Sequence, residues 1–548
     1  MSVESKPLHK GNKKHLSLPT TICGLFLLFV FLLSIYAVTY LSKNSIDSDA
    51  SSELILAEHL AKTNQILSRD WTYSTELRII DTQILNSLLF RLTDNWQHIR
   101  IGSGLIHQMI LLLSYLFFCR KSHFSLKASL LTCSLLLLPI NVAYGRIVLY
   151  HNYYVPHIAF SFLTVGLLIG ALENKNKHRT IDTLLLFAIA FLSGLKGVRH
   201  LLITFVPLLM VFTIRAFIRI YKQKQRFFSK ETIHMFTLPV VSLIFCLLGF
   251  LGNCVLAKFY TFRNYKDNIL WELMPISELP ELLQSYLYQF GFRNNIKIIS
   301  LLGFLSAIGI GCGTWAIVES GKSLIRKTEY DQTRYLTDSF FSCVVGLTVF
   351  IFLFAYKDYG FILYLIPCIV WIFPLIAGAL DRISLQKFTA TAQGLIPLIC
   401  TVGLIINGFI NLFWLTDDIY FQQEYEGLSF KDNSIVSSLS GPTKFLDDHN
   451  MTVGYASFWH ANILTEMTNG KIRMIPVHIL DDFPAFNNWL TFKNPPKSND
   501  GNTFLLLSTE ENFYQFDNAT LVYDDGTFFI YQFNDNELRD RVFRFEEQ

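Results

Sequence analysis

Two carboxylates follow the first apolar stretch of the chain at a spacing that suits acid–base chemistry. Asp47 and Asp49 stand one residue apart, directly after a run over 18–41 that is expected to cross a membrane. Such a pair can share a divalent cation, or it can divide into a base and the group that orients this base. Together with Glu53 the same residues also fit the N-terminal cap of a helix, so a purely structural role is the competing interpretation.

Positively charged side chains gather in short turns that the hydropathy pattern places on the same side of the membrane. Short outer turns normally contain few Lys and Arg residues, because these side chains are costly to translocate. A lipid-linked phosphate would account for them, since a guanidinium can hold a phosphate with two parallel hydrogen bonds. The competing interpretation is that each side chain extends to lipid headgroups or pairs with a loop carboxylate. We assign phosphate binding to Arg146, Lys196, Arg199, His200 and Lys357.

A third group of residues is suited to hydrogen bonding with a sugar or an acceptor. Tyr73 and Glu76 lie in the segment YSTELR, which combines an aromatic ring, hydroxyls and a carboxylate. Glu76 fits equally well the first turn of a helix that is capped by Ser74 or Thr75. His151 lies close to several tyrosines in the second outer turn, and we place it in the same group.

The composition identifies the environment in which these residues must act. The chain has 548 residues, of which 51% are hydrophobic, 15% aromatic and 16% charged. Soluble domains usually contain about 25% charged residues. A soluble fold of this length could not bury so many apolar side chains, which excludes an ordinary cytosolic enzyme. The 46 basic and 43 acidic residues nearly cancel, which argues against a nucleic-acid-binding protein.

About eleven apolar runs have the length or near-length to cross a bilayer, which takes roughly 20 residues per helix. Lys and Arg concentrate in the loops on the side of the N-terminus, and this side is therefore expected to be cytoplasmic. We predict an α-helical polytopic membrane protein with its N-terminus inside and its C-terminus outside. The runs lie near 18–41, 101–118, 128–143, 155–172, 181–193, 201–214, 233–253, 298–318, 339–355, 360–379 and 389–415.

The chain divides into three parts. Residues 1–17 form a cytoplasmic tail, 18–415 a multi-pass membrane domain, and 416–548 an extracytoplasmic domain. In the membrane domain, the outer loop 42–100 contains two amphipathic segments, 49–68 and 76–93, each suited to lie on the membrane surface. The last part has short alternating runs, a helical stretch at 461–468 and a hairpin turn at 523–527, which predicts a small α/β domain.

This arrangement resembles the GT-C superfamily of membrane glycosyltransferases, in particular the protein mannosyltransferases and the lipid A aminoarabinose transferases. The shared features are the many-helix body, the Asp-x-Asp motif of Asp47 and Asp49, the long first outer loop and the outward C-terminal domain. The resemblance implies transfer of a sugar from a polyprenyl phosphate to a hydroxyl, with Asp47 or Asp49 as the base. A divalent cation at Asp47 and Asp49 stays an open alternative, because the next outer loop, YGRIVLYHNY, lacks the second acidic motif that the family pattern often adds.

Three functions from different classes are consistent with the sequence. The first is inverting transfer from a polyprenyl-phosphate-linked sugar donor to a glycan, lipid or protein acceptor at the outer face of a plasma (inner) membrane, or at the lumenal face of a reticulum membrane. A flippase for a lipid-linked saccharide would need ionisable residues in the middle of its helices, and most of the runs lack them. A non-catalytic scaffold is the third function. Motifs for ATP, nicotinamide, serine-hydrolase and zinc-protease chemistry are absent from the sequence.

Overall fold

The structure is a computed structural model. It describes residues 18–74, 77–173, 177–223, 230–263, 272–294, 296–325, 332–355, 361–385, 392–413, 434–479, 484–496, 502–512, 516, 518–534, 538 and 542–543.

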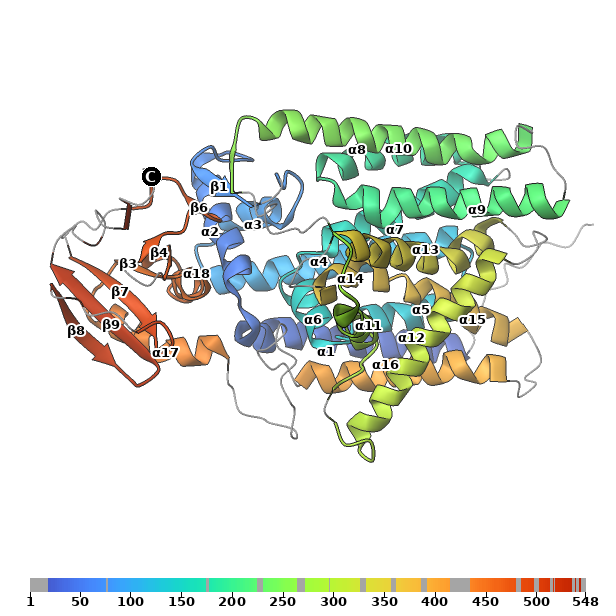
Figure 1. The fold of residues 1–548 in the computed structure, drawn as a ribbon. Coiled ribbons are helices and arrows are strands. Elements are labelled where there is room, and N and C mark those ends of the chain that lie inside the picture. Colours follow the sequence, from blue (N-terminus) through green and yellow to red (C-terminus); the bar gives the residue numbers. More distant parts are fainter. Residues whose placement is uncertain are drawn as a thin grey trace, which may run out of the picture.

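A bundle of long helices makes up most of the molecule (Figure 1). Among the described residues, nine helical stretches are long and apolar enough to cross a membrane, so the prediction of a polytopic α-helical protein is confirmed. The predicted runs 128–143 and 181–193 form α5 and α8, which are shorter, with 11 and 17 residues. The count of eleven crossings and the direction of insertion stay predictions. The helices are α1 (Leu18–Tyr36), α4 (Trp96–Lys121), α5 (Leu126–Leu136), α7 (Val155–Leu172), α8 (Arg179–Leu195), α9 (Val206–Gln223), α10 (Lys230–Ala257), α11 (Leu279–Tyr288), α12 (Leu301–Ile325), α13 (Gln332–Phe354), α14 (Phe361–Ile369), α15 (Ile372–Leu385) and α16 (Ala392–Phe413).

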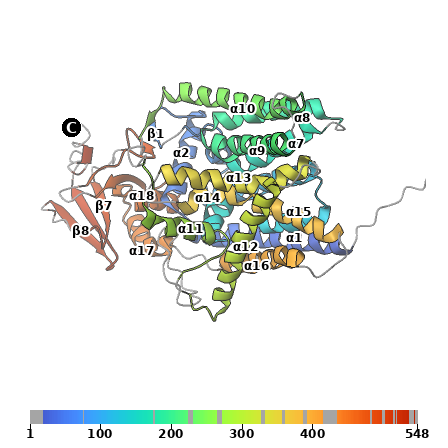
Figure 2. The ribbon, with the colours of Figure 1, turned by 45° about the vertical axis from the view of Figure 1, so that its right-hand side comes forward.

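Glycine permits a close crossing of two helices in the bundle. Helix α12 runs obliquely to the other long helices and packs against α13 and α16 (Figures 1 and 2). Helices α8 and α10 lie against each other with their backbones in close approach. A Cβ atom on Gly194 would lie 1.8 Å from the Cys246 carbonyl oxygen, and one on Gly249 would lie 2.0 Å from that of Phe191. Small residues permit such close packing where two apolar helices meet in lipid.

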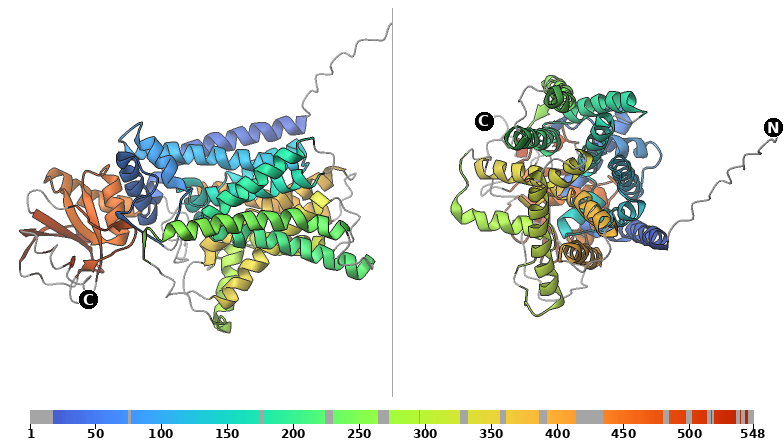
Figure 3. Two further views of the ribbon diagram at one scale, coloured as in Figure 1. Left: turned by 90° about the horizontal axis from the view of Figure 1, so that it is seen from above. Right: turned by 90° about the vertical axis from the view of Figure 1, so that its right-hand side faces the viewer.

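The C-terminal part forms a small α/β domain at one end of the bundle (Figures 1 and 3). Its six strands have the order β5-β4-β3-β7-β9-β8, and the central strands β4, β3 and β7 run parallel. Helices α17 (Ile435–Asp448) and α18 (Phe458–Met467) belong to the same domain. The predicted hairpin joins the antiparallel strands β8 and β9. The strands are β3 (Val453–Ser457), β4 (Arg473–His478), β5 (Ala485–Phe486), β7 (Asn502–Ser508), β8 (Ala519–Asp524) and β9 (Phe528–Asn534).

A connecting layer lies between the bundle and this domain (Figure 3). It contains α2 (Ser48–Thr63), α3 (Thr82–Phe90) and a three-stranded sheet with the order β2-β1-β6. The sheet joins distant parts of the chain, because β1 (Trp71–Tyr73) pairs with β2 (Thr261–Phe262) and with β6 (Thr491–Phe492). Helix α2 packs between α3 and α18, and ten of its 16 residues are buried. The C-terminal domain is therefore joined firmly to the segment that carries the Asp-x-Asp motif.

Candidate active site

Asp47 begins helix α2 shortly after the chain leaves α1. Helix α1 continues as a π-helical turn, η1 (Ala37–Leu41), and a 3-10 turn, η2 (Ser42–Ser45). Asp47 then has an extended backbone, and its carboxylate accepts a 2.7 Å hydrogen bond at Oδ1 from the Ala50 amide. The residue is therefore the N-cap of α2, as its structural interpretation predicted. Its second oxygen, Oδ2, is left for other partners.

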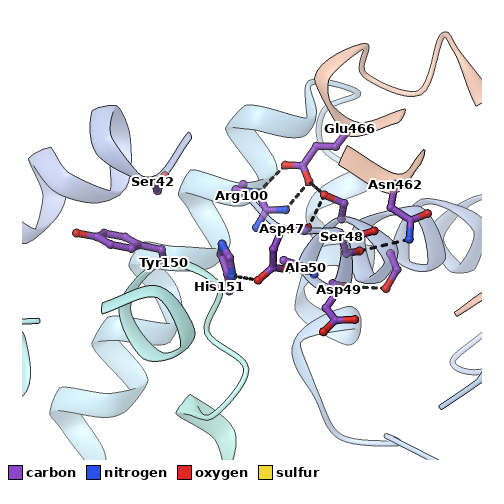
Figure 4. Close-up of polar contacts among 12 residues, drawn as sticks. Ser42, Asp47, Ser48, Asp49, Ala50, Arg100, Tyr150, His151, Asn462 and Glu466 are labelled. Atoms are coloured by element: carbon purple, nitrogen blue, oxygen red, sulfur yellow. Dashed lines mark hydrogen bonds and ion pairs between the residues drawn. The ribbon is translucent and has the colours of Figure 1, made fainter. Parts of the chain in front are cut away.

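Two residues of the second predicted outer turn meet this second oxygen. The Nε atom of Arg146 lies 3.3 Å from Oδ2 of Asp47, and Nδ1 of His151 lies 3.1 Å from the same atom. The contact with His151 is visible in Figure 4. The structure thus joins three of the residues that the sequence singled out, although they come from two separate loops. Arg146 therefore pairs with a loop carboxylate, as the competing interpretation of the outer-turn cations predicted.

π-helical turns accompany these residues. Turn η1 precedes Asp47, turn η3 (Gly145–Tyr150) contains Arg146, and turn η4 (Leu201–Phe205) follows His200 directly. A π turn holds one residue more than an α turn, so it rotates the side chains that follow it, and such turns are frequent at functional sites. Turn η3 is entered from the short helix α6 (Val142–Tyr144), whose N-cap is Asn141. Arg146 lies within η3 and His151 follows it directly, and both side chains reach Asp47 at the N-terminus of α2.

The electrostatics of Asp47 favour its ionised form. Burial alone would raise the pKa of Asp47, but the adjoining His151 and Arg146 and the Ala50 amide together lower it below its usual value. Burial lowers the pKa of His151, even though Asp47 opposes this effect. Arg146 is therefore the permanent positive charge of the group. Asp47 is an ionised carboxylate whose two oxygens both have partners.

Asp49 is placed quite differently in the first turn of α2. Its Oδ1 atom is buried and has no hydrogen-bond partner among the residues that the structure describes. Burial and the neighbouring charge of Asp47 raise the pKa of Asp49 to about 7. A carboxyl group that titrates near neutral pH, and whose oxygen is not already engaged, is suited to accept a proton from a substrate. The Asp-x-Asp pair has thus divided into two carboxylates of different character.

Glu53, one turn further along α2, belongs to a network that the sequence did not suggest. Nη1 of Arg78 lies 2.6 Å from Oε1 of Glu53, and Thr82 donates a hydrogen bond to the same carboxylate. Burial raises the pKa of Glu53 to about 7, although Arg78 opposes this shift. Arg78 also interacts with Asp49 and lies 5.7 Å from the centroid of the Tyr153 ring. It was missed because an arginine on the polar face of an amphipathic segment needs no further explanation.

Lys196 is occupied by an internal partner. Its Nζ atom lies 2.7 Å from Oδ2 of Asp81, and both side chains are almost completely buried. Nζ also donates a hydrogen bond to the Ile80 carbonyl oxygen. Asp81 caps helix α3 by accepting a hydrogen bond from the Thr82 amide. The pair therefore attaches the N-terminus of α3 to the C-terminal end of α8. Pairing with a loop carboxylate was the competing interpretation for this cation.

Arg199 and His200 lie beside aromatic rings. The Arg199 guanidinium is half-buried and lies 5.6 Å from the ring centroid of Tyr154 and 6.0 Å from that of Tyr364. His200 is buried, and its ring is 5.1 Å from that of His157. Neither ring nitrogen of His200 has a hydrogen-bond partner among the described residues. This group has the cationic and polar atoms that an anion would require.

Tyr73 is not brought to Asp47. Tyr73 is buried in β1 against Tyr260 and Phe262, and its hydroxyl accepts a hydrogen bond from the Ser68 amide. These contacts fix the connecting layer. Glu76 and Lys357 lie outside the described residues.

A buried ion pair that sequence reasoning missed lies on the other side of Asp47. Arg100 of α4 donates to Glu466 of α18, with 2.6 Å between Nε and Oε1, and a second contact joins Nη2 to Oε2. Ser51 of α2 donates to Glu466 as well, at 2.7 Å. The sequence placed Arg100 at the edge of an apolar run and Glu466 in a helix of the tail. Spacing alone gives no signal that two such distant residues meet.

The donors around the Asp-x-Asp pair do not fit a metal ion. Among the residues that the structure describes, no group of three or more His, Cys, Asp or Glu side chains could hold one. Asp47 is paired with Arg146 and contacts His151, and Asp49 interacts with Arg78, so positively charged side chains already lie beside both carboxyl groups. Calcium and magnesium instead require several oxygen ligands. The predicted divalent cation therefore has no suitable ligand set at Asp47 and Asp49.

Comparison with known proteins identifies the fold. No protein-family model and no curated protein sequence matches the chain. The chain is similar to the crystal structure of ArnT from Cupriavidus metallidurans in the apo state, with a TM-score of 0.50 and 10% sequence identity over 94% of this chain and 98% of that chain. The chain has the fold of ArnT. This confirms the fold that the resemblance implied, and at 10% identity it concerns the fold alone.

Two further solved structures are less similar. ArnT from Cupriavidus metallidurans bound to undecaprenyl phosphate has a TM-score of 0.48 and 10% identity, over 95% of this chain and 99% of that chain. The oligosaccharyltransferase of Archaeoglobus fulgidus, in complex with zinc and sulfate, has a TM-score of 0.39 and 13% identity, over 82% of this chain and 62% of that chain.

Proposed function

We propose that this protein is a glycosyltransferase that moves a sugar from a polyprenyl-phosphate donor to a hydroxyl group of a glycan, lipid or protein acceptor. The membrane-embedded helix bundle and the ArnT fold support a lipid-linked donor. The observation that carries the proposal is the division of the Asp-x-Asp pair. Asp47 is held ionised by Arg146 and His151, whereas Asp49 has a free buried oxygen and a pKa near 7.

In the proposed reaction Asp49 is the general base. The acceptor oxygen attacks the anomeric carbon of the donor, the bond from that carbon to the phosphate oxygen breaks, and the hydroxyl proton passes to Asp49. The leaving polyprenyl phosphate keeps the electrons of the broken bond. Asp47 does not take the proton. Its fixed negative charge lies next to Asp49 and maintains the basicity of that carboxylate.

The leaving phosphate needs positive charge close to the point where it departs. Arg199, a half-buried cation beside the Tyr154 and Tyr364 rings, is assigned to this task. Burial lowers the pKa of the neighbouring His200 to about 3, so this residue contributes a hydrogen bond from a neutral ring and no charge. The guanidinium can donate two hydrogen bonds to a phosphate, and a buried cation stabilises the developing negative charge more than an exposed one does. Lys357 is assigned to the same task from the sequence alone.

The location follows from the predicted topology. With the N-terminus inside, residues 416–548 form a domain outside the plasma (inner) membrane, and Asp47, Asp49 and Arg199 all lie in loops on that side. Transfer would then occur at the outer face, where a lipid-linked sugar and a cell-envelope acceptor can meet.

Reconstituted protein provides the test. The full chain in proteoliposomes is incubated with a panel of radiolabelled sugars on polyprenyl phosphate and with cell-envelope extracts as the source of acceptor. The expected results are labelled acceptor and release of free polyprenyl phosphate, both lost in the Asp49→Asn variant. Thr443→Ala, in helix α17 of the C-terminal domain, is the matched control and should retain turnover. Full turnover by Asp49→Asn would contradict the proposed base, and label that crosses the bilayer without any transfer would favour a flippase.

A further inference from the structure

The C-terminal domain reaches the candidate active site through one buried carboxylate. Glu466 projects from α18 and holds the Arg100 guanidinium with two contacts, and the side chains of the two residues are only 4% and 8% exposed. Ser51, which lies one turn after Asp47 in α2, donates to the same carboxylate. Glu466 therefore contacts both the membrane bundle and the helix that Asp47 caps.

Arg100 also faces Asp47. The two side chains interact electrostatically, and Figure 4 shows the Arg100 guanidinium between the carboxylates of Glu466 and Asp47. Two negative groups thus compete for one buried positive charge. The observed structure resolves this competition in favour of Glu466, because two guanidinium nitrogens, Nε and Nη2, donate to that carboxylate. Asp47 instead pairs with Arg146 and His151.

We propose that Glu466 is a positioning residue of the active site, which neutralises Arg100 and so leaves the Asp47 carboxylate to Arg146 and His151. This inference rests on the proposed function, because it gives the C-terminal domain a direct part in setting the charge around the catalytic base. The domain is then part of the catalytic unit, and the charge balance of the site is complete only when α18 is docked on α2 and α4.

The consequence for the base can be followed through the charges that surround it. Asp47 is faced by Arg146 and His151 from the second turn, by Arg100 from α4, and by Asp49 from its own helix. Asp49 itself is faced by Asp47, Arg78, Glu53 and Arg146. Without the charge of Glu466, the positive field of Arg100 acts more strongly on Asp47, and it reaches Asp49 by offsetting the Asp47 charge. An additional unpaired cation favours the ionised form of a carboxyl group and makes it a weaker base.

A second ion pair between the same two parts of the molecule gives a matched control. Arg473 of β4 lies 2.6 Å from Glu58, which is three turns along α2 from Asp47. This pair also docks the C-terminal domain on α2, but no described contact joins it to Asp47 or Asp49. Loss of the Arg473 charge therefore tests docking alone, whereas loss of the Glu466 charge tests docking together with the charge balance.

The experiment compares Glu466→Gln, Arg473→Gln and the double variant Arg100→Gln/Glu466→Gln, each as full chain in proteoliposomes. Glutamine keeps the size of Glu466 and its ability to accept from Ser51. We expect Glu466→Gln to lose up to about threefold in kcat above pH 8, with the acid limb of its pH–rate profile moved down by about half a pH unit. Arg473→Gln should lose less than about twofold, with the limb unmoved. The double variant should regain most of the lost kcat, because it no longer contains an unpaired Arg100.

Two outcomes would overturn the inference: a double variant no more active than Glu466→Gln, or a Glu466→Gln profile that drops at every pH without a shift. A purely structural role predicts the second of these, because lost docking alone leaves the pKa of Asp49, and with it the acid limb, unmoved. If the wild-type protein transfers no sugar, the proposed function fails, and the charge balance is then judged by thermal unfolding. Recovery in the double variant of the Tm lost in Glu466→Gln supports it, and a further fall in Tm contradicts it.

Discussion

Arg146 and Asp47 form an ion pair with 3.3 Å between Nε and Oδ2, and this contact joins the cap of helix α2 to a π-helical turn of the next predicted outer loop. The pair has a clear effect on the neighbouring carboxylate. With its own oxygens engaged, Asp47 stays ionised, and its charge is one reason why Asp49 holds a proton up to about pH 7. The chemistry proposed for this protein depends on that difference.

The first prediction concerns the pH dependence of transfer. Asp49 must be ionised to accept a proton, and its pKa is about 7, so kcat should rise with pH through neutrality and level off above pH 8. Asp49→Asn should lose about a thousandfold in kcat above pH 8, which lies within the usual contribution of one general base, and the loss should become smaller toward pH 5, where wild-type Asp49 is protonated. Steady-state transfer measured between pH 5 and 9 provides the check, with Asp49→Glu as the variant that retains a carboxylate. A flat wild-type profile over this range would contradict the assignment.

The second prediction concerns stability rather than rate. The pKa of Asp49 is raised from 3.8 to about 7, so the folded state binds this proton more tightly than the unfolded state. A raised carboxyl pKa lowers stability as the pH increases from about 4 to 7, and the whole cost is present above pH 7. Asp49→Asn removes this cost and should therefore unfold at a higher temperature than wild type at pH 8, by roughly 2 °C or more. The difference should become smaller at pH 5. Thermal unfolding in detergent at both pH values provides the measurement, and an equal difference at the two would argue against the raised pKa.

The third prediction concerns the partner of Asp47. Arg146→Gln leaves a largely buried carboxylate with His151 and one amide, and we expect a loss of about 2 to 4 kcal/mol in stability, since removal of one member of a buried pair leaves an unpaired charge. Arg146→Lys keeps the charge and should lose less. The double variant Asp47→Asn/Arg146→Gln should recover most of the stability but little of the activity, because the charge beside Asp49 is gone. Recovery of full activity in that double variant would show that the charge of Asp47 is not needed.

Local patterns predicted the parts of the molecule, but they did not predict which charges meet. The apolar runs gave the helices of the bundle, and alternating runs with the turn at Tyr523–Thr527 gave strands β8 and β9, because these elements depend on neighbouring residues. Asp47 was identified from its place after α1. Its contact with Arg146, and the pair of Arg100 with Glu466, depend on the packing of distant segments, which no spacing in the sequence records.

Lys196 is the clearest example of a contact that spacing in the sequence could not predict. As a cation in a short outer turn it was assigned to phosphate, with pairing to a loop carboxylate as the alternative. The carboxylate that it meets, Asp81, lies in the first outer loop and had no distinguishing signal of its own. Arg199, three residues later, is half-buried and lies against two tyrosine rings. Two neighbouring cations of the same turn therefore have different surroundings, and we propose a structural role for Lys196 and phosphate binding for Arg199.

The fourth prediction separates these two roles. Lys196→Gln leaves the buried Asp81 carboxylate without its cation, so we expect a large loss of stability, about 3 to 5 kcal/mol, and a correspondingly lower Tm. Arg199→Gln should change the Tm little, because the side chain is only half-buried, but it should raise the KM for the lipid-linked donor by about tenfold and lower kcat as well. The double variant Asp81→Asn/Lys196→Gln is the control, and it should restore the Tm together with donor turnover if Lys196 acts only through Asp81. A double variant that folds well and yet cannot use the donor would instead assign Lys196 to the phosphate.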